Sequence, residues 1–239
     1  MKKTFITLLT FIILVSSCKK ETIVTPVVEK PKLLQSAVTT SDGKVIEQYT
    51  YEYDAQQRIF KETEAQSASV CDWTHSTNKM TLKCPGFSVD WDYTIINGLV
   101  TQRIDKITNE RQEYEYDTQQ HYTKTVRYDK DGKVVRTTNF IYNNEGNKTD
   151  IIVSGGTNTK YEYSKTVLAT TNISTGYPMF GIDTKNAVMR ETSKDIKGTT
   201  LSDTIYAYET DEKGYIIKKT ATDVLKPNQQ AIVTVYSYK

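Results

Sequence analysis

The sequence predicts an all-β fold in which repeated hairpins form an antiparallel meander that curls into a sheet or closes into a barrel. The heptad Tyr-Glu-Tyr-Asp-Ala-Gln-Gln at 51–57 returns almost unchanged as Tyr-Glu-Tyr-Asp-Thr-Gln-Gln at 114–120. Looser copies begin at Tyr128, Tyr142 and Tyr206, and each is followed by a glycine turn. No long stretch has convincing helical periodicity, so the chain reads as strands and turns throughout.

Each copy of the repeat encodes a strand followed by a turn. Its two tyrosines are separated by one residue and therefore share a face of the strand, and Asp54 or Asp117 then begins the turn. Gln57 and Gln120 stand where the looser copies have glycine. These two turns either hold a left-handed non-glycine residue, at a cost of about 1 kcal/mol, or belong to another turn type.

The N-terminus has the features of an export signal. Lys2 and Lys3 precede an apolar run at 5–15 that is too short to span a bilayer as a helix. The run ends in Val-Ser-Ser-Cys18, which resembles the lipobox of bacterial lipoproteins, in which the cysteine is diacylated and becomes the new N-terminus. The alternative is an ordinary signal peptide followed by an incidental cysteine.

These features predict the domain organisation. We expect a lipoprotein signal peptide at 1–17, a lipid anchor on Cys18, a flexible tether at 18–32 and a single all-β domain at 33–239. Lys19 follows the acylated cysteine, where an aspartate would resemble an inner-membrane retention signal. We therefore expect a lipid-anchored protein of the outer membrane, facing either the periplasm or the medium.

The charge balance excludes a nucleic-acid partner. Loss of the signal peptide removes two of the 31 basic side chains, so 29 basic groups balance the 29 acidic ones. A neutral chain without a polybasic segment lacks the electrostatic footprint that nucleic acid or anionic lipid requires.

Turn signals divide the domain into strands with short connections. Ser41-Asp42-Gly43 and Asn97-Gly98 are hairpin turns in which glycine takes the left-handed conformation. Short connections place neighbours in sequence next to each other in space. Besides the strands of a hairpin at 71–84, the expected strands are 33–40, 44–53, 58–66, 87–96, 99–107, 114–116, 121–128, 133–142, 147–153, 157–163, 201–210, 215–223 and 231–238.

Cys71 and Cys84 are expected to form a disulfide, because an exported compartment is oxidising. A turn at 76–79 places His75 opposite Met80, and counting outward then places Cys71 opposite Cys84, within disulfide reach. The alternative is a metal site that includes His75, but two thiols and one imidazole lack an obvious fourth zinc ligand. We expect no metal and no cofactor.

The segment 173–188 breaks the hairpin pattern. Three turn residues, Gly176, Pro178 and Gly181, alternate there with large apolar side chains such as Met179 and Phe180. Exposure of these apolar groups to water would be costly, so we expect a plug that covers one end of the sheet. The alternative is a functional surface loop.

The lipobox, the Tyr-x-Tyr-Asp hairpins, the late segment Gly181-Ile-Asp-Thr-Lys-Asn186-Ala-Val and the closing run from Tyr206 to Tyr215 resemble a family of exported bacterial lipoproteins. That family is catalogued as a domain of unknown function with a porin-like fold. The hairpins also resemble the tyrosine-aspartate repeats of secreted wall and toxin proteins. The resemblance covers most of 33–239 and implies a curled antiparallel sheet or barrel without an assigned activity.

The porin-like fold does not imply a pore. A strand that spans the outer membrane needs an apolar lipid-facing side, whereas faces here carry Lys61 with Thr63, and Lys124 with Val126. Lys219 with Ala221 is a third such face. We expect a soluble domain held at the membrane by the lipid on Cys18.

Catalytic patterns are missing from the sequence, so we expect no enzyme. His75 and His121 stand in no metalloprotease motif and beside no evident nucleophile. The run Asp129-Lys-Asp131-Gly132 lacks the acids that a calcium loop needs at its first and last positions. Acidic side chains abound, so a pair for glycoside hydrolysis stays open, although nothing nominates one.

The aromatic content points to binding. The chain has 17 tyrosines, and aromatic faces with polar tips bind sugars and peptides, although most of these rings are expected to fill the concave face of the sheet. Trp73, on the disulfide hairpin, is the candidate ligand contact. The first hypothesis is a module that binds or scaffolds glycan or peptide. The second is a carrier of a small apolar ligand inside a barrel, and the third is a hydrolase.

Overall fold

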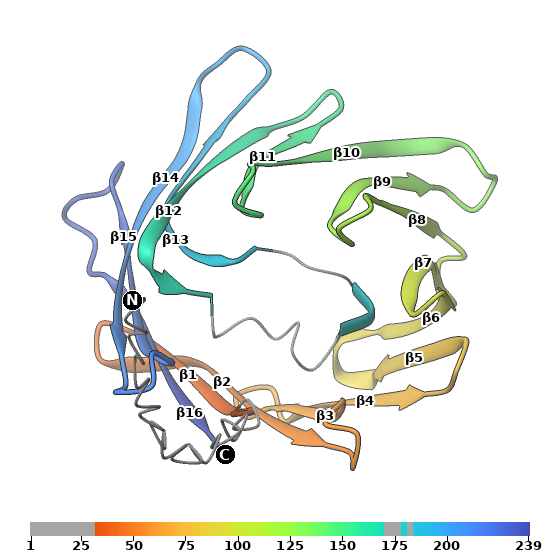
Figure 1. Ribbon diagram of the computed structural model, residues 1–239, viewed down its shortest axis with the longest axis horizontal. Helices are drawn as coiled ribbons and strands as arrows, with labels where there is room; N and C mark the ends of the chain where they lie inside the picture. The colour runs from red at the N-terminus through yellow and green to blue at the C-terminus, as the bar shows by residue number, and fades with distance from the viewer. Residues whose placement is uncertain (1–31, 170–177, 181–183) are drawn as a thin grey trace, which may run out of the picture. The chain divides into compact units, whose positions relative to one another are not determined.

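The computed structural model describes residues 32–169, 178–180 and 184–239, and these form a closed antiparallel barrel of sixteen strands (Figure 1). The ring runs in sequence order, and each strand pairs with its predecessor and its successor. Within the described residues the only helical elements are two 3-10 turns, η1 (Pro85–Phe87) and η3 (Pro178–Phe180). No helix in these ranges is long and apolar enough to cross a bilayer.

The strand bounds are β1 (Leu34–Ser41), β2 (Lys44–Tyr53), β3 (Ile59–Glu64), β4 (Ser69–His75), β5 (Lys79–Cys84), β6 (Val89–Ile96), β7 (Leu99–Asp105), β8 (Arg111–Tyr116), β9 (Tyr122–Tyr128), β10 (Val134–Tyr142), β11 (Lys148–Val153), β12 (Asn158–Leu168), β13 (Asn186–Lys194), β14 (Thr200–Thr210), β15 (Ile216–Asp223) and β16 (Ile232–Tyr238).

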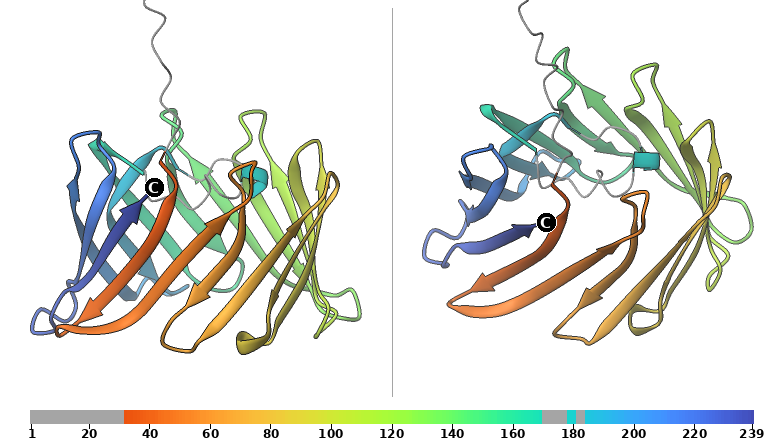
Figure 2. Two further views of the ribbon diagram at one scale, coloured as in Figure 1. Left: turned by 90° about the horizontal axis from the view of Figure 1, so that it is seen from below. Right: turned by 60° about the horizontal axis from the view of Figure 1, so that its bottom comes forward.

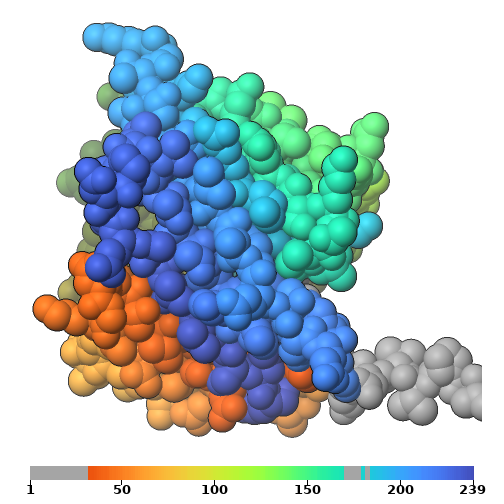
Figure 3. All heavy atoms as spheres, turned by 90° about the vertical axis from the view of Figure 1, so that its left-hand side faces the viewer, coloured from red at the N-terminus to blue at the C-terminus, as the bar shows by residue number. Residues whose placement is uncertain are grey.

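Pairing of the first strand with the last closes the barrel. β1 pairs with β2 on one side and with β16 on the other, with Val38 opposite Val235. The backbones of Leu33 and Lys239 exchange two hydrogen bonds of 3.0 Å, which extends this pairing to the chain end. In the space-filling view the first strands lie directly against the last (Figure 3). Of the two architectures that the sequence allows, the curled sheet and the barrel, the structure has the barrel.

The barrel has two distinct ends. We call the end that holds Leu34 and Tyr238 the terminal end, and it lies at the top of the left panel of Figure 2. Its turns connect each even-numbered strand to the next odd one. We call the opposite end the far end, and its eight loops connect each odd-numbered strand to the next even one.

The repeated motif folds into the same turn each time. The Oδ1 atom of Asp54 accepts hydrogen bonds from the backbone N–H of Gln56 and Arg58, both at 2.9 Å, and Asp117 bonds the equivalent amides. Gln57 and Gln120 have φ values of +64° and +67°. Of the two alternatives for these turns, the structure has the left-handed residue, in the position that glycine takes in the looser copies.

A β-bulge follows each of these turns. In the hairpin of β2 and β3, Tyr53 pairs with Ile59 but Glu52 pairs with Lys61, so the return strand contains one extra residue. The same shift occurs in the hairpins of β8 with β9, β10 with β11 and β14 with β15. One extra residue reverses which side chains of the return strand face inward.

Cross-strand pairing places most tyrosines on the inner face. That face carries the most buried side chains, including Ile59, Met80 and Val100 with no exposed surface. The inward tyrosines come from strands around the whole ring, which shows that the repeat supplies the barrel lining. They are Tyr49, Tyr51, Tyr53, Tyr93, Tyr114, Tyr116, Tyr122, Tyr142, Tyr161, Tyr163, Tyr206, Tyr208, Tyr236 and Tyr238.

Five of these tyrosines make the same hydrogen bond at the terminal end. Each phenol comes from an even-numbered strand and donates to a backbone carbonyl near the start of the preceding strand. We call this contact the tyrosine latch, and it ties neighbouring strands together beyond their ladder hydrogen bonds. The donor and acceptor pairs are Tyr53 with Leu34 (2.8 Å), Tyr116 with Val100 (2.7 Å), Tyr208 with Val188 (2.6 Å), Tyr238 with Ile216 (2.7 Å), and Tyr163 with Lys148.

The outer wall carries ion pairs between adjacent strands, interspersed with exposed apolar side chains such as Ile205 and Val235. Each partly exposed pair is expected to contribute at most about 1 kcal/mol to the free energy of unfolding, so the pairs add little to the stability of the barrel. The pairs are Glu52 with Lys61 (3.4 Å), Lys79 with Asp92 (2.9 Å), Glu115 with Lys124 (2.8 Å), Arg190 with Asp203 (2.7 Å) and Glu209 with Lys218 (2.6 Å). Lys61 and Lys124 lie on this wall as expected, whereas Lys219 and Ala221 face inward.

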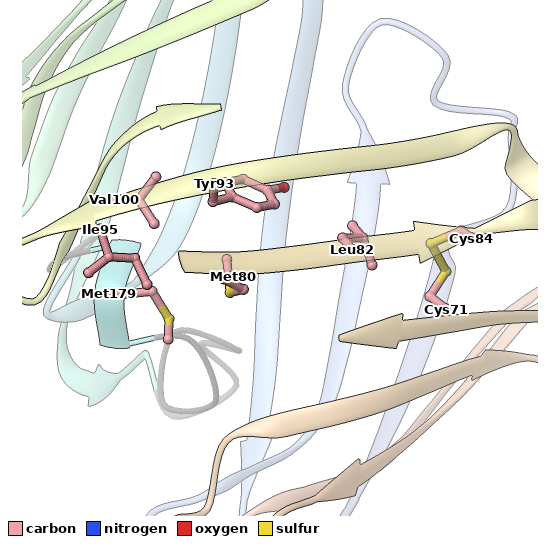
Figure 4. Close-up of a cluster of buried hydrophobic side chains, with 8 residues drawn as sticks. All are labelled: Cys71, Met80, Leu82, Cys84, Tyr93, Ile95, Val100 and Met179. Atoms are coloured by element: carbon pink, nitrogen blue, oxygen red, sulfur yellow. A yellow bond between two sulfur atoms is a disulfide. The ribbon is translucent and has the colours of Figure 1, made fainter. Parts of the chain in front are cut away.

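The larger hydrophobic cluster of the described residues includes the disulfide that joins β4 and β5 and extends from it along the inner wall (Figure 4). Cys71 and Cys84 are bonded, with their Cα atoms 4.1 Å apart, and His75 lies opposite Met80 as the hairpin register predicts. The disulfide removes the thiols that the metal alternative needs. Among the described residues no group of three potential metal ligands lies together.

The region after β12 differs from the prediction. Residues 186–194 form strand β13, whereas the sequence predicts irregular structure to 188 and no strand there. A further copy of the aspartate turn, from Asp195 to Gly198, connects this strand to β14. Asn-Ala-Val-Met-Arg-Glu-Thr-Ser-Lys lacks the tyrosine pair of the repeat, which explains why the pattern misses it.

We predict that Tyr116→Phe lowers the free energy of unfolding by about 1 kcal/mol, because the Val100 carbonyl loses the phenol that bonds it. Tyr114→Phe is the matched control, since Tyr114 faces inward on the same strand without a latch. Urea denaturation followed by circular dichroism measures both. Equal effects of the two substitutions would contradict a stabilising role for the latch.

Candidate functional site

The lumen is the candidate site because many inward side chains keep part of their surface accessible. Barrels of about sixteen strands enclose more space than their side chains fill. Glu191, Tyr206 and Lys219 all face inward yet are only half-buried, in contrast to Tyr93, which is 3% exposed. The lumen is therefore not filled by side chains along the wall formed by β13, β14 and β15.

A pocket of about 220 Å³ opens on this wall, and we call it the lumen pocket. Its floor combines two phenols with one ammonium and one carboxylate. Its lining comes from the three adjacent strands and from the residues that flank the connection into β13. The lining residues are Ala169, Thr184, Asn186, Ala187, Val188, Glu191, Tyr206, Tyr208, Ile216 and Lys219.

Strand pairing brings the polar groups of the lumen pocket together. The Tyr206 hydroxyl donates to Oε2 of Glu191 at 3.3 Å, and Nζ of Lys219 lies 5.6 Å from the centre of the Tyr206 ring. Tyr208 pairs directly with Lys219 across β14 and β15. No ion pair holds the Lys219 ammonium among the described residues. The pocket therefore presents a cation, a carboxylate and two aromatic faces to the lumen.

Burial shifts the pKa values of these groups away from their ordinary range. Burial, and then the charge of Glu191, raises the pKa of Tyr206 to about 12. Burial also lowers the pKa of Lys219, while Glu191 and Glu47 act in the opposite direction. On β3, burial raises the pKa of Glu62, which also faces inward. Each shift favours the neutral form, as expected where water is partly excluded.

Aromatic rings surround a second cation in the lumen. Nζ of Lys148 lies 5.6 Å from the ring centre of Tyr122, 5.7 Å from that of Phe140 and 5.8 Å from that of Tyr161. Such distances allow cation–π attraction. The Lys148 residue is 8% exposed, so this group belongs to the wall rather than to the open lumen.

Trp73, the candidate ligand contact, lies on the inner face of the disulfide hairpin and is partly buried. Its ring stacks on Tyr93 with 6.1 Å between centroids, and both belong to or pack against the hydrophobic cluster of β4 to β7. Alternation on β4 places Trp73 on the same side as Cys71, which explains its inward direction. Its position borders the lumen but not the lumen pocket.

Between β12 and β13 the structure describes the turn η3, which packs against the inner wall formed by β5 to β8. Phe180 contacts the edges of Tyr93 and Tyr114 at 5.5 and 6.4 Å, and Met179 is 8% exposed (Figures 1 and 4). The described part of the expected plug thus packs inside the barrel, while 173–177 and 181–183 lie outside the described residues.

Asn147 holds the segment that leads into β13 at the terminal end. Its Oδ1 atom accepts hydrogen bonds from the backbone N–H of Lys185 (3.1 Å) and Asn186 (2.8 Å) and from the Thr184 hydroxyl (3.1 Å). Its Nδ2 atom donates to Oδ1 of Asn186 at 3.1 Å. Asn147 is 1% exposed, so the β10–β11 turn fixes one edge of the lumen pocket.

A larger groove of about 680 Å³ lies on the outer wall near the far-end turns of β11 to β14. Lys160, Glu162, Arg190 and Lys194 line it, together with exposed Ile196. Arg190 is already paired with Asp203, and no aromatic ring contributes a binding face. We place the candidate site in the lumen because two phenols, a carboxylate and an ammonium group converge on its wall, whereas the outer groove has no aromatic ring.

The two histidines have structural partners. A ring nitrogen of His75 lies 2.7 Å from the Ile59 carbonyl oxygen, and His121 stacks on Tyr142 with Nδ1 3.0 Å from Asp117. Cys18 and its lipobox lie outside the described residues. Sequence reasoning missed Glu191, Tyr206 and Lys219, because they come together only when three strands align in register.

The comparisons with known proteins support the fold. A porin-like protein from Bacteroides uniformis superposes with a TM-score of 0.66 at 11% identity, covering 88% of this chain and 98% of that one. A porin-like protein from Bacteroides vulgatus superposes with a TM-score of 0.63 at 8% identity, covering 86% and 98%. No protein-family model matches the sequence, and no curated protein matches it. At these identities the likeness concerns architecture, so the porin-like fold is confirmed and the lipoprotein family stays a prediction.

We predict that the stability of the barrel falls as pH rises from 10 to 12. Tyr53 and Tyr206 have pKa values raised to about 12 in the fold, against 10.0 for an ordinary tyrosine. As pH rises from 10 to 12, tyrosines lose their protons in the unfolded chain before they do so in the fold, which favours the unfolded chain. Below pH 10 both states keep these protons, so the full stability is present. Tyrosinate absorbance measures the ionisation, and circular dichroism in the same samples measures the loss of the fold. Titration of all tyrosines near pH 10 with the fold intact would contradict the prediction.

Proposed function

We propose that this chain is a lipid-anchored protein of the cell envelope whose barrel binds a glycan or peptide in its lumen. The observation that supports this most directly is the lumen pocket, where Tyr206 and Tyr208 lie beside Glu191 and Lys219. Aromatic faces pack against the apolar faces of sugar rings, while carboxylate and ammonium groups bind hydroxyl groups. A volume of about 220 Å³ admits a small part of such a ligand, with the rest extending into the lumen.

The charges on the wall favour a polar ligand over an apolar one. A wholly apolar ligand would leave Lys219 and Glu191 without compensation for the water they lose. The accessible pocket is nevertheless the feature that the carrier hypothesis requires, so carriage of a small apolar ligand is the second candidate. A hydrolase is less favoured, because the lining of the lumen pocket contains no serine, cysteine or histidine.

The barrel is proposed to be soluble. Its outer wall carries charges in mid-strand, such as Lys61, Glu115 and Lys218, where a lipid-facing wall would be apolar. Strands β3, β5, β8 and β11 have six residues each. Six residues span about 20 Å even without tilt, less than the apolar band of about 25 Å that a membrane barrel needs.

Attachment to the membrane is proposed to come from the lipid on Cys18, with the signal peptide at 1–17 removed and 18–32 as tether. Lys19 in place of aspartate favours the outer membrane. The barrel itself then needs no lipid contact along its wall, which agrees with the ion pairs on the outer face.

We predict that Lys219→Met weakens ligand binding about tenfold or more, because a hydrogen bond to a charged group contributes about 1.5–3 kcal/mol. The barrel is screened first against neutral and acidic oligosaccharides, peptides and fatty acids, and hits are measured by isothermal titration calorimetry. Lys218→Met is the matched control, since Lys218 is adjacent in sequence but lies on the outer wall, paired with Glu209.

Each outcome separates the candidates. Glycan or peptide binding that Lys219→Met weakens and Lys218→Met leaves unchanged supports the proposal. Binding of fatty acids alone would favour the carrier. Binding that both substitutions weaken equally would place the site outside the lumen and contradict the proposal.

A further inference from the structure

The far end of the barrel carries a ring of exposed apolar side chains. Six of its eight loops have a large apolar residue in the loop or at the start of the next strand, between 46% and 75% exposed. We call these six the far-rim ring. They are Val45, Phe87, Ile107, Val134, Ile196 and Leu225.

The terminal end differs from the far end in this respect. Its turns at 54–58, 117–121, 143–147 and 211–215 contain no exposed large hydrophobic residue. Ile96 and Leu168, 55% and 50% exposed, are isolated at the terminal end, whereas at the far end such residues recur in six loops of one rim. Scattered apolar residues are normal on a protein surface, but a set that recurs around one rim marks an interaction surface.

Lysines accompany the apolar residues of the far-rim ring. Five of the six have a lysine directly beside them in sequence, as in Lys133-Val134 and Ile196-Lys197. Neighbouring acids instead bond amides within their loops: Asp105 accepts from Ile107 N–H at 2.8 Å, and Asp223 from Leu225 N–H at 2.9 Å. The rim thus combines aliphatic tips with adjacent ammonium groups.

Two of the adjacent lysines also contact an acid. Lys106 lies 3.7 Å from Asp90, and Lys226 lies 3.3 Å from Asp223. Their side chains are 43% and 68% exposed, so both ammonium groups stay in contact with water. Long lysine side chains of this kind extend past apolar neighbours and keep their charge at a polar boundary.

We propose that the far-rim ring docks on the surface of a lipid bilayer. Aliphatic tips enter the boundary between headgroups and acyl chains, and the adjacent ammonium groups meet lipid phosphates. A lipid surface fits this rim because five of its six loops supply both an aliphatic tip and an adjacent lysine, the two groups that a boundary between acyl chains and phosphates takes up together.

The proposed anchor permits this orientation. The barrel begins at the terminal end, and the fourteen residues from Lys19 to Lys32 span at most about 50 Å when extended. A strand of eight residues such as β1 covers about 26 Å along its length. The tether is therefore long enough to pass the barrel wall while the far rim rests on the same membrane.

Vesicle co-sedimentation of residues 32–239 tests the proposal without the lipid on Cys18. This part folds on its own, because all sixteen strands and the pairing that closes the ring lie within it. The probes are vesicles of phosphatidylcholine alone and of phosphatidylcholine with phosphatidylglycerol. We expect sedimentation with vesicles, and we expect Ile196→Ser with Leu225→Ser to weaken partitioning at least about tenfold for each side chain that inserts.

The matched control is Ile96→Ser with Ile141→Ser. These residues are 55% and 44% exposed, so they resemble the far-rim pair in exposure, but they lie at the terminal end. Partitioning that survives this double substitution supports docking by the far rim. No sedimentation, or an equal loss in both double variants, would overturn the proposal. A dimer that forms without lipid and dissociates in the Ile196 and Leu225 variant would assign the ring to a second copy of the chain instead.

Discussion

The tyrosine latch is the contact on which the rest of the barrel depends. A ladder of strands alone does not fix where a sheet closes, since each strand accepts a neighbour in several registers. At the terminal end a phenol from one strand bonds the first carbonyls of the strand before it, as Tyr53 does to Leu34 and Tyr238 does to Ile216. The inward tyrosines of the repeat therefore both line the barrel with their rings and fix the strand register with their hydroxyl groups. Because β16 carries a latch, the last strand is held in place for β1 to complete the ring.

Several of the most deeply buried residues lie near the terminal end, which also borders the lumen pocket through Asn186 and Ile216. Ile59, Val100, Asn147 and Ile216 all lie near that end and have at most 1% of their surface exposed. Asn147 holds the backbone at the start of β13 there. The far end contains buried residues as well, such as Ser69 and Cys84, each 4% exposed, and its loops carry the exposed apolar side chains of the far-rim ring.

The sequence predicts the hairpins but not the site. Strand and turn chemistry is local, so the Asp54 and Asp117 turns and the pairing of Cys71 with Cys84 follow from spacing alone. Closure requires pairing of residues about two hundred positions apart, and no local signal marks it. The meeting of Tyr208 with Lys219 was hidden by the bulge between Glu209 and Thr210, which shifts the register by one residue and reverses the face. The inward direction of Trp73 could not be predicted either, because a hairpin gives no sign of which face the barrel will enclose.

The central claim is that the barrel has its aromatic face inside and its charged face in water. Its most direct test is thiol labelling of Thr138→Cys and Asn139→Cys in residues 32–239, in buffer without detergent, with a bulky maleimide. These neighbours on β10 point to opposite sides, Thr138 inward and 8% exposed, Asn139 outward and exposed. The account predicts a monomeric protein in which position 139 reacts rapidly and position 138 slowly. Rapid reaction at 138 with protection at 139, or a chain that stays dispersed only in detergent, would contradict it.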